Sequence, residues 1–355
     1  MVTDKVFTSG NEAAGRAAIL AGCRHYYGYP ITPQNELTAY MAENMPAVGG
    51  VFIQSESELA AISMVHGSSA AGARAMTSSS SPGISLKQEG ISYLAGAELP
   101  AVIVNVQRAG PGLGGISLAQ GDYFQAVKGG GHGDYHCIVL APASVQEMAD
   151  LVFDAFDLSD KHRTPAIVLS DALIGQMMEP VSFDLERRPG VWPKPWALTG
   201  AAGGRPRNIV KSFFLLGGDL EIHNVHLQEK YERIRHSEVR VECVNVEDAE
   251  VIIVAYGTPA RISLELVAGE VGRSLSVGLV RPITLWPFPS DVLRGLARPG
   301  RSFLVVELSA GQMVEDVKLA IEGRAPVHFL GRMGGGLPAA AEIELEIRSI
   351  LGGTR

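Results

Sequence analysis

The sequence predicts an α/β protein with two parallel-sheet domains, a doubly wound one followed by a smaller one. Apolar strand-like runs alternate with helix-length segments along most of the 355 residues. The runs AVIVNV (101–106) and AIVLSD (166–171) are apolar throughout, as strands covered by helices on both faces are. A Pro- and Gly-rich break at 189–206 separates two such alternations.

The first alternation contains strand-like runs separated by segments of helix length. The runs are 25–30, 51–55, 73–78, 100–106, 137–141 and 166–171. The segments between them are amphipathic or rich in Ala and Gly, which favours helices. They are 11–22, 34–44, 57–71, 83–95 and 144–158. Crossovers between parallel strands are right-handed, so these helices should cover both faces of one sheet.

The second alternation follows a polar stretch with helical character at 223–238. Its strand-like runs are 251–257, 276–282, 302–308 and 326–331. We therefore expect a first domain over 1–185, a linker with a polar helix over 186–245, and a second α/β domain over 246–355.

The composition argues against several classes of protein. The formal net charge of −8 is unfavourable for a nucleic-acid partner. No apolar run approaches the roughly 20 residues that span a bilayer, and the N-terminus has no apolar signal-peptide core. We therefore expect a cytoplasmic protein without membrane or nucleic-acid partners. The three cysteines, Cys23, Cys137 and Cys243, are too dispersed for a disulfide framework, and an iron–sulfur cluster would need about four thiolates.

Polar or Gly-rich loops follow the first four strands. Their sequences are GYPITPQ (28–34), QSESE (54–58), TSSSSPG (77–83) and NVQRAGPGLGG (105–115). Ligands of open parallel sheets bind at the carboxyl ends of the strands, so these loops should meet at one edge. Their concentration there predicts a binding site.

Each loop has a structural explanation beside a chemical one. The prolines around Thr32 fix the direction of its hydroxyl, or Thr32 only caps a helix. Glu56 and Glu58 either stabilise a helix N-terminus or place a buried carboxyl where it shares a proton with a ring nitrogen. The serine loop suits an anion or a heterocycle, or is a flexible linker. Arg108 suits a carboxylate ligand, unless it pairs with a structural acid.

Two further segments carry motifs whose role the sequence leaves open. In KGGGHGDYH (128–136), His132, Asp134 and His136 alternate as metal ligands do in an extended loop. No second acid cluster is close in sequence, so we favour a loop packed against a partner. The apolar WPFP (286–289) belongs either to the core or to a protein interface.

Together these motifs resemble the α subunit of the 2-oxoacid:ferredoxin oxidoreductases. The combination is specific and extends over nearly the whole chain, although no single motif would suffice. The start Gly10–Ala13 and MTSSSSPG are most similar to the 2-oxoisovalerate (3-methyl-2-oxobutanoate) subgroup. The motifs that carry the resemblance are GYPITP (28–33), QSESE (54–58), ARAMTSSSSPGISLKQEG (73–90), NVQRAGPGLG (105–114), HGD (132–134), VAYGT (254–258) and VGLVRPITLWPFP (277–289).

The resemblance implies a pyrimidine-binding domain of a thiamine diphosphate enzyme, followed by a transketolase C-terminal-like domain. It implies thiamine diphosphate shared with a β subunit that binds the diphosphate and Mg²⁺, and iron–sulfur clusters held by β and γ or δ subunits. The chain has no GDG…N diphosphate motif and no cluster-forming cysteines. The implied reaction is oxidative decarboxylation of a 2-oxoacid with coenzyme A to acyl-CoA, CO₂ and reduced ferredoxin, and it requires the partner subunits.

The resemblance also implies roles for individual residues. Glu58 matches the glutamate that contacts the thiamine pyrimidine ring, with Glu56 as the alternative. Arg108 matches the arginine that binds the substrate carboxylate, and Thr32 matches the hydroxyl facing the substrate. We take Glu58, Arg108 and Thr32 as catalytic and expect no metal ligand on this chain. The other expected cofactor contacts are Tyr29, Pro30, Ile31, Ser79, Ser80 and Gly83.

The substrate is expected to be 2-oxoisovalerate or another branched-chain 2-oxoacid. Many pyruvate and 2-oxoglutarate relatives have Ser-Thr-Gly in the arginine loop, where this chain has Pro111–Gly114. Leu113 would make the pocket wall more apolar, which suits a branched or aromatic side chain. Such a wall discriminates one methylene by only ~1–3 kcal/mol. Specificity for 2-oxoglutarate, pyruvate or an aromatic 2-oxoacid is the alternative. The rival functions are another thiamine enzyme, such as a transketolase or a non-oxidative decarboxylase, and a non-catalytic scaffold subunit.

Overall fold

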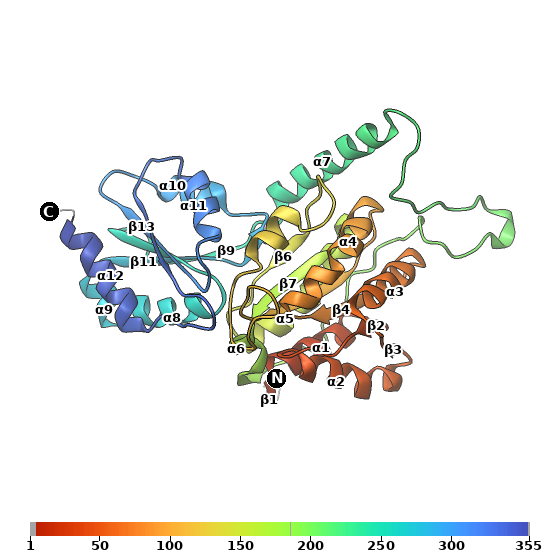
Figure 1. Ribbon diagram of the computed structural model, residues 1–355, viewed down its shortest axis with the longest axis horizontal. Coiled ribbons are helices and arrows are strands. Elements are labelled where there is room, and N and C mark those ends of the chain that lie inside the picture. Colours follow the sequence, from red (N-terminus) through yellow and green to blue (C-terminus); the bar gives the residue numbers. More distant parts are fainter. Residues whose placement is uncertain (1–4, 185, 354–355) are drawn as a thin grey trace.

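The computed structural model describes residues 5–184 and 186–353 (Figure 1). The largest of its three sheets has seven strands and is called the larger sheet below. Six of these strands are parallel and correspond to the six predicted runs of the first alternation. In spatial order the strands are β12 (Thr284–Trp286), β6 (Ile138–Leu140), β7 (Ala166–Asp171), β5 (Val102–Gln107), β4 (Ala75–Ser79), β2 (His25–Gly28) and β3 (Val51–Gln54).

Helices cover this sheet in two groups, as the predicted right-handed crossovers require. In one group α1 packs against both α2 and α5, and in the other α3 packs against α4. The bounds are α1 (Gly10–Leu20), α2 (Asn35–Asn44), α5 (Val145–His162), α3 (Glu58–Ala70) and α4 (Ser81–Gly96). The doubly wound α/β class predicted from the sequence is therefore confirmed.

A five-stranded sheet lies beside the first. Its order is β14 (Val327–Gly331), β13 (Ser302–Glu307), β10 (Val251–Val254), β11 (Val277–Pro282) and β9 (Val241–Val244). Along β10, Val251 and Ile253 face a core shared with α8 and α12, whereas Ile252 and Val254 join the core of the larger sheet. The accompanying helices are α8 (Gly257–Ala268), α9 (Glu270–Ser274), α10 (Ser290–Leu296), α11 (Met313–Ile321) and α12 (Ala340–Gly353).

Three antiparallel pairings were not predicted. β9 pairs with β11, although it lies before the predicted start of the second domain at residue 246. β1 (Val6–Ser9) pairs with β8 (Met178–Val181), and β8 follows the short helix α6 (Ala172–Gln176) in the chain. β12 lies within the predicted second domain but pairs with β6 of the larger sheet. The two halves of the chain therefore share a sheet.

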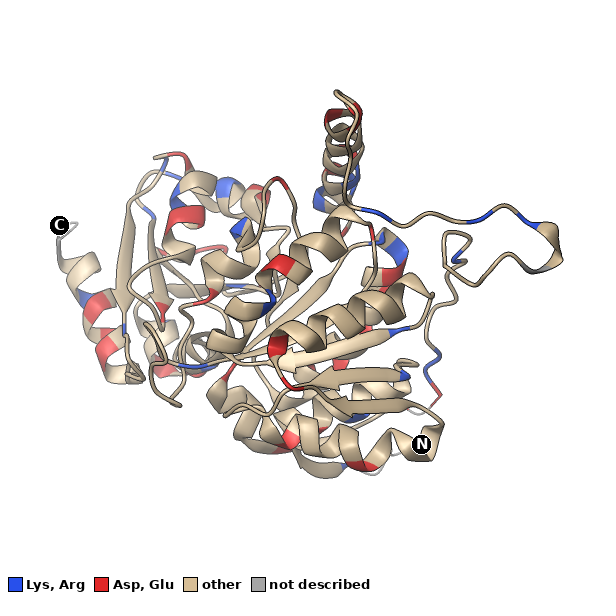
Figure 2. Ribbon diagram, turned by 45° about the vertical axis from the view of Figure 1, so that its right-hand side comes forward, with Lys and Arg blue, Asp and Glu red and all other residues tan. Residues whose placement is uncertain are grey.

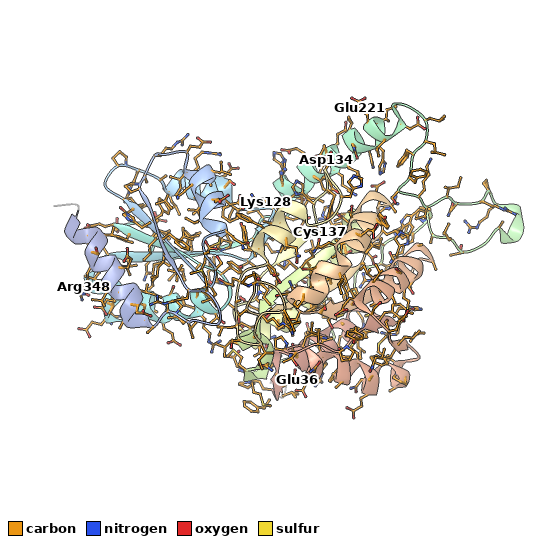
Figure 3. All side chains as sticks on the ribbon, viewed as in Figure 1. Glu36, Lys128, Asp134, Cys137, Glu221 and Arg348 are labelled. Atoms are coloured by element: carbon orange, nitrogen blue, oxygen red, sulfur yellow. The ribbon has the colours of Figure 1, made fainter. Side chains whose placement is uncertain are left out.

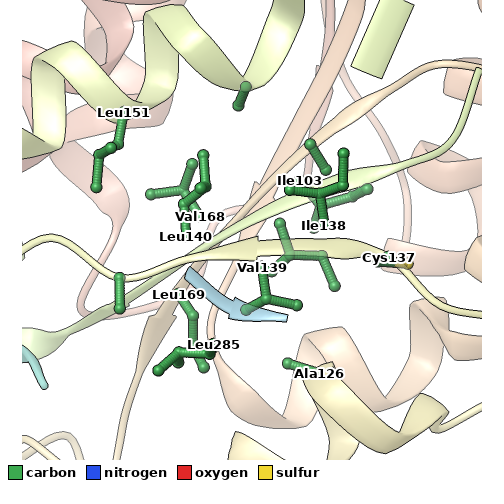
Figure 4. Close-up of a cluster of buried hydrophobic side chains, with 14 of the residues drawn as sticks. Ile103, Ala126, Cys137, Ile138, Val139, Leu140, Leu151, Val168, Leu169 and Leu285 are labelled. Atoms are coloured by element: carbon green, nitrogen blue, oxygen red, sulfur yellow. The ribbon is translucent and has the colours of Figure 1, made fainter. Parts of the chain in front are cut away.

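The WPFP segment belongs to the core around β12. Leu285 lies among side chains of the larger sheet that include Ile103, Val139 and Leu169 (Figure 4). Trp286 is buried, and its ring stacks on His136 with the ring centroids 4.5 Å apart. His136 is thereby used for packing between the two halves.

The rest of the 128–136 loop also contacts neighbouring elements. Lys128 forms an ion pair with Asp316 of α11 (Figure 3). The carbonyl of Asp134 accepts a hydrogen bond from Gln228 of α7 (Asp219–Ser237) at 3.0 Å. No group of three or more His, Cys, Asp or Glu side chains within 5–184 and 186–353 could hold a metal ion.

His136 should make the fold sensitive to acid. Burial lowers its pKa from the ordinary 6.5 to about 4, and Arg235 adds to this effect. The folded state therefore takes up this proton less readily than the unfolded state. The contribution of neutral His136 to the free energy of unfolding is fully present above about pH 6.5 and is lost as the pH falls toward 4. We expect the melting temperature of His136→Phe, which retains a stacked ring, to fall less than that of wild type when the pH is lowered from 6.5 to 4. An equal loss in both proteins would contradict this assignment.

A basic segment connects the two halves. Residues 187–218 contain six Lys or Arg and no Asp or Glu. The segment runs outward from the body before returning to α7 (Figure 2). No helix within the described residues is long and apolar enough to cross a membrane.

Buried polar contacts join the two sheets near their carboxyl edges. The Asp171 carboxylate accepts hydrogen bonds from the Leu173 and Ile174 amides and from both the amide and hydroxyl of Thr258. Gln120 donates from Nε2 to the Tyr256 carbonyl and accepts from the Leu308 amide. These contacts hold the start of α8 and the end of β13 against the larger domain.

Asp171→Ala should therefore destabilise the chain strongly. It leaves several buried donors without an acceptor, and we expect a loss of about 3 kcal/mol or more in the free energy of unfolding, measured by denaturant titration. The control is Asp291→Ala, because the Asp291 side chain is 95% exposed and its pair with Arg294 lies on the surface. A loss no larger than that of the control would show that Asp171 does not hold the two halves together.

Candidate active site

The carboxyl ends of β2, β4 and β5 meet at one edge of the larger sheet, and the predicted loops leave from it. At this edge α4 begins directly after Ser80, and α3 begins at Glu58 after β3. The side chain of Ser57 accepts a hydrogen bond from the Ala60 amide, so it caps α3. Because Ser57 performs the capping, neither neighbouring glutamate is needed for it.

The two glutamates of QSESE have different environments. Glu56 is exposed, whereas Glu58 is only 6% exposed. A Cβ atom on Gly83 would lie 2.5 Å from Glu58 Oε1 and 2.1 Å from Ser79 Oγ. Glycine at position 83 is thus what lets the carboxyl and the serine hydroxyl approach the start of α4.

Buried polar atoms without partners surround this carboxyl. The hydroxyls of Ser79 and Ser80 are fully buried and have no hydrogen-bond partner, and the same holds for Nζ of Lys87. Buried polar groups in folded proteins are nearly always paired, so this concentration is typical of a site that receives a polar ligand.

Arg108 lies at the end of β5 with its guanidinium directed to backbone carbonyls. It donates from Nη1 to the Thr32 carbonyl at 3.0 Å and from Nη2 to the Leu113 carbonyl at 2.9 Å. Its Nε is buried without a partner. None of the ion pairs found among the described residues involves Arg108, so the alternative of a structural acid partner is not supported. The guanidinium keeps its charge available for an anionic ligand.

The YPITP loop and Leu113 lie nearer to solvent. Tyr29 and Pro30 are exposed, and Ile31 and Thr32 are partly buried. The Thr32 hydroxyl accepts from Asn35 Nδ2 at 3.2 Å, while its carbonyl binds Arg108. Leu113 is 79% exposed in this chain, and its role as an apolar pocket wall stays a prediction. Its carbonyl binds Arg108.

A cleft of about 450 Å³ opens beside Arg108 between the two halves of the chain. Ser81, Pro111 and Asp122 line one side, and Ser309, Gln312 and Met333 line the other. The positive φ of Gly114 lets the arginine loop turn back on Ala109, whose carbonyl would lie 1.8 Å from a Cβ there. The cleft thus joins the arginine loop to the end of β13.

Sequence reasoning missed two residues of this region. Asp122 lines the cleft and accepts from Asn105 Nδ2 at 2.8 Å, and burial raises its pKa. Lys87 lies in α4 near Glu58. The available signal for Lys87 was its position among the small and apolar residues of α4, at helical spacing from Gly83 and Gly90. Asp122 follows an irregular Gly-rich segment, and no pattern marked it.

The chain matches two family models. The first, described as pyruvate flavodoxin/ferredoxin oxidoreductase, thiamine diphosphate-binding, matches residues 16–206. The second, described as pyruvate:ferredoxin oxidoreductase core domain II, matches residues 249–343. The boundary between the matches falls in the region of the basic segment and α7.

Individual relatives match over most of the chain. It is 52% identical to the ketoisovalerate oxidoreductase subunit VorB of Methanothermobacter thermautotrophicus, over 97% of each chain. It is 40% identical to the 2-oxoglutarate synthase subunit KorA of Archaeoglobus fulgidus, over 87% of this chain and 89% of that one.

A solved structure has the same architecture. It is a 2-oxoglutarate:ferredoxin oxidoreductase from Magnetococcus marinus with 2-oxoglutarate, coenzyme A and succinyl-CoA bound. The match has a TM-score of 0.86 and 26% identity, and covers 98% of this chain but 65% of that one. The chain thus spans just under two thirds of the solved chain's length.

Proposed function

Because the chain belongs to the 2-oxoacid:ferredoxin oxidoreductase family, we propose that it is the α subunit of an enzyme for 2-oxoisovalerate or another branched-chain 2-oxoacid. The enzyme oxidatively decarboxylates this acid with coenzyme A to acyl-CoA and CO₂ and reduces ferredoxin. The observation that carries the proposal is the buried Glu58 carboxyl, held against Gly83 where serine hydroxyls have no partner. The ketoisovalerate named for VorB supports the substrate class.

The residues around Glu58 fit the pyrimidine ring of thiamine diphosphate. A flat heterocycle with ring nitrogens and an amino group can satisfy the unpaired hydroxyls of Ser79 and Ser80, and the missing side chain of Gly83 leaves it room. Tyr29, Pro30 and Ile31 would border the ring from the β2 loop. When bound, thiamine diphosphate supplies a carbon nucleophile that makes loss of CO₂ from a 2-oxoacid possible.

Each catalytic residue has a distinct task in this proposal. Glu58 exchanges a proton with the ring nitrogen that it contacts, and its burial keeps water from competing for that proton. Arg108 binds the substrate carboxylate, and the Thr32 and Leu113 carbonyls fix the direction of the guanidinium. The Thr32 hydroxyl orients the substrate beside it. Asp122 lines the adjoining cleft, where the pKa raised by burial suits a group that holds a proton.

The remaining components belong to partner subunits. We assign the diphosphate and Mg²⁺ to a β subunit, and the iron–sulfur clusters that pass electrons to ferredoxin to β and γ or δ subunits. The free thiols support this assignment, since Cys23 and Cys137 are buried apart from each other and only Cys243 is exposed. They also suit the reducing cytoplasm, where we place the complex.

The proposal is tested by isolating the tagged chain anaerobically from the cells that produce it. We expect a brown complex with a smaller partner chain and bound thiamine diphosphate, which reduces ferredoxin with coenzyme A and a 2-oxoacid. In a panel of substrates, 2-oxoisovalerate should give a higher kcat/KM than pyruvate, 2-oxoglutarate or an aromatic 2-oxoacid. A colourless, thiamine-free assembly of this chain alone would overturn the function, whereas a different preferred acid would overturn only the substrate.

A further inference from the structure

Lys87 is buried without any compensating contact. Its side chain is 0% exposed, and Nζ has no hydrogen-bond partner and no ion pair within 4.0 Å. The chain's other deeply buried lysine, Lys230, is only 5% exposed but donates to Glu98 Oε1 at 3.2 Å and to the Arg163 carbonyl at 3.1 Å. Burying an unpaired ammonium is unfavourable for stability, so Lys87 needs an explanation other than packing.

The packing of α3 on α4 places Lys87 beside the active-site acid. Gly83 of α4 faces Glu58 of α3. About two helical turns later, Gly90 faces Ile62, whose Cγ2 would lie 2.5 Å from a Cβ on Gly90. Lys87 lies between these two glycines on the same face of α4. Its side chain therefore enters the seam between Glu58 and Ile62, where the glycines keep the helices close.

Glu58 is the charged group that acts on Lys87. Burial lowers the pKa of Lys87 to about 8, and the negative charge of Glu58 opposes this shift. The strands beneath α4 present Thr77, Ser79 and Asn105, none of which carries a charge. At neutral pH the seam thus contains one ammonium and one carboxyl in surroundings that screen charge poorly.

We propose that Lys87 is a positioning residue that supplies the counter-charge for the Glu58 carboxyl that meets the thiamine ring. This inference rests on the proposed function. Lys87 would act through Glu58 and have no contact with the substrate. Since opposite charges attract each other strongly where they are poorly screened, removing the ammonium should weaken the contact that Glu58 makes with the ring.

A double-mutant cycle on the αβ complex tests the coupling through thiamine diphosphate affinity, measured by calorimetry across pH. Lys87→Met keeps a long apolar stem without the charge. We expect Lys87→Met and Glu58→Gln each to weaken thiamine diphosphate binding by about tenfold at pH 7. The double variant should bind the cofactor no more weakly than the single variant with the lower affinity. Lys87→Arg should restore the pH profile, and the control Lys230→Met should lower the melting temperature without changing that profile. Additive losses, or unchanged binding in Lys87→Met, would overturn the inference.

A second measurement needs no cofactor, so it separates failure of this inference from failure of the proposed function. The folded state binds fewer protons than the unfolded state between about pH 8 and the ordinary lysine value of 10.5. Wild type should therefore gain melting temperature relative to Lys87→Met as pH rises through this window. In Glu58→Gln the gain should begin at lower pH, because the charge that retains the proton on Lys87 is gone. A gain that begins at the same pH in both backgrounds would overturn the inference, even if the complex binds thiamine diphosphate.

Discussion

Replacing Glu58 by glutamine should lower the kcat of the assembled enzyme by about 10²- to 10⁴-fold at saturating thiamine diphosphate. Glutamine has the shape of the buried glutamate and can still form a hydrogen bond beside Gly83, but it cannot exchange a proton with the ring. The start of α3 should be retained, because Ser57 rather than Glu58 caps this helix. The measurement is ferredoxin reduction under anaerobic conditions, together with the rate of deuterium exchange at thiamine C2.

The matched control is Glu56→Gln. It makes the same chemical change two residues earlier, on an exposed side chain. We expect its kcat to stay within about twofold of wild type, as for surface substitutions in general. If Glu56→Gln were the inactive variant and Glu58→Gln the active one, the assignment of the cofactor acid would be reversed.

If Arg108 binds the substrate carboxylate as proposed, replacing it by alanine should reduce kcat/KM for the 2-oxoacid by about 10³-fold, since a desolvated counter-charge is removed. The affinity for thiamine diphosphate should change much less, because Arg108 lies outside the group of unpaired hydroxyls around Glu58. Arg108→Lys keeps the positive charge but loses the two parallel N–H donors of the guanidinium, so its kcat/KM should lie between those of wild type and Arg108→Ala. Substrate titrations of ferredoxin reduction give these values.

This variant also distinguishes an enzyme subunit from a scaffold. In a scaffold, Arg108 would matter only through its bonds to the Thr32 and Leu113 carbonyls, so Arg108→Ala would change the melting temperature and leave turnover intact. The control is Arg298→Ala, because Arg298 also donates to a backbone carbonyl, that of Glu247, far from the cleft. Equal kinetics in the two variants would exclude a role for Arg108 in substrate binding.

The sequence predicted the parallel strands well, because a strand covered on both faces, such as Val102–Gln107, is apolar along most of its length. It also predicted that the loops after β2, β4 and β5 leave from one edge of the sheet, as they do. It could not decide between Glu56 and Glu58, since both stand at a helix start and only the cap by Ser57 and the packing against Gly83 separate them. Whether Leu113 forms a wall of the substrate pocket depends on which way a loop side chain points, which composition does not determine.

The antiparallel strands were missed for a different reason. β12 consists of Thr284–Trp286, and a run this short gives no alternation to detect. Its pairing with β6 joins segments more than a hundred residues apart, and local patterns carry no information about such contacts. Lys87 was overlooked because a single lysine in a helix is most often solvent-exposed; its burial depends on how closely Gly83 and Gly90 let α3 approach.

The position of β12 has a consequence for biosynthesis. A ribosome releases the chain from its N-terminus, so the larger sheet lacks its last strand until residue 286 has emerged. Until then, the edge of β6 and the apolar surface that Leu285 and Trp286 later cover are open to other nascent chains. The larger sheet can thus be completed only after the part of the second domain up to β12 has been made.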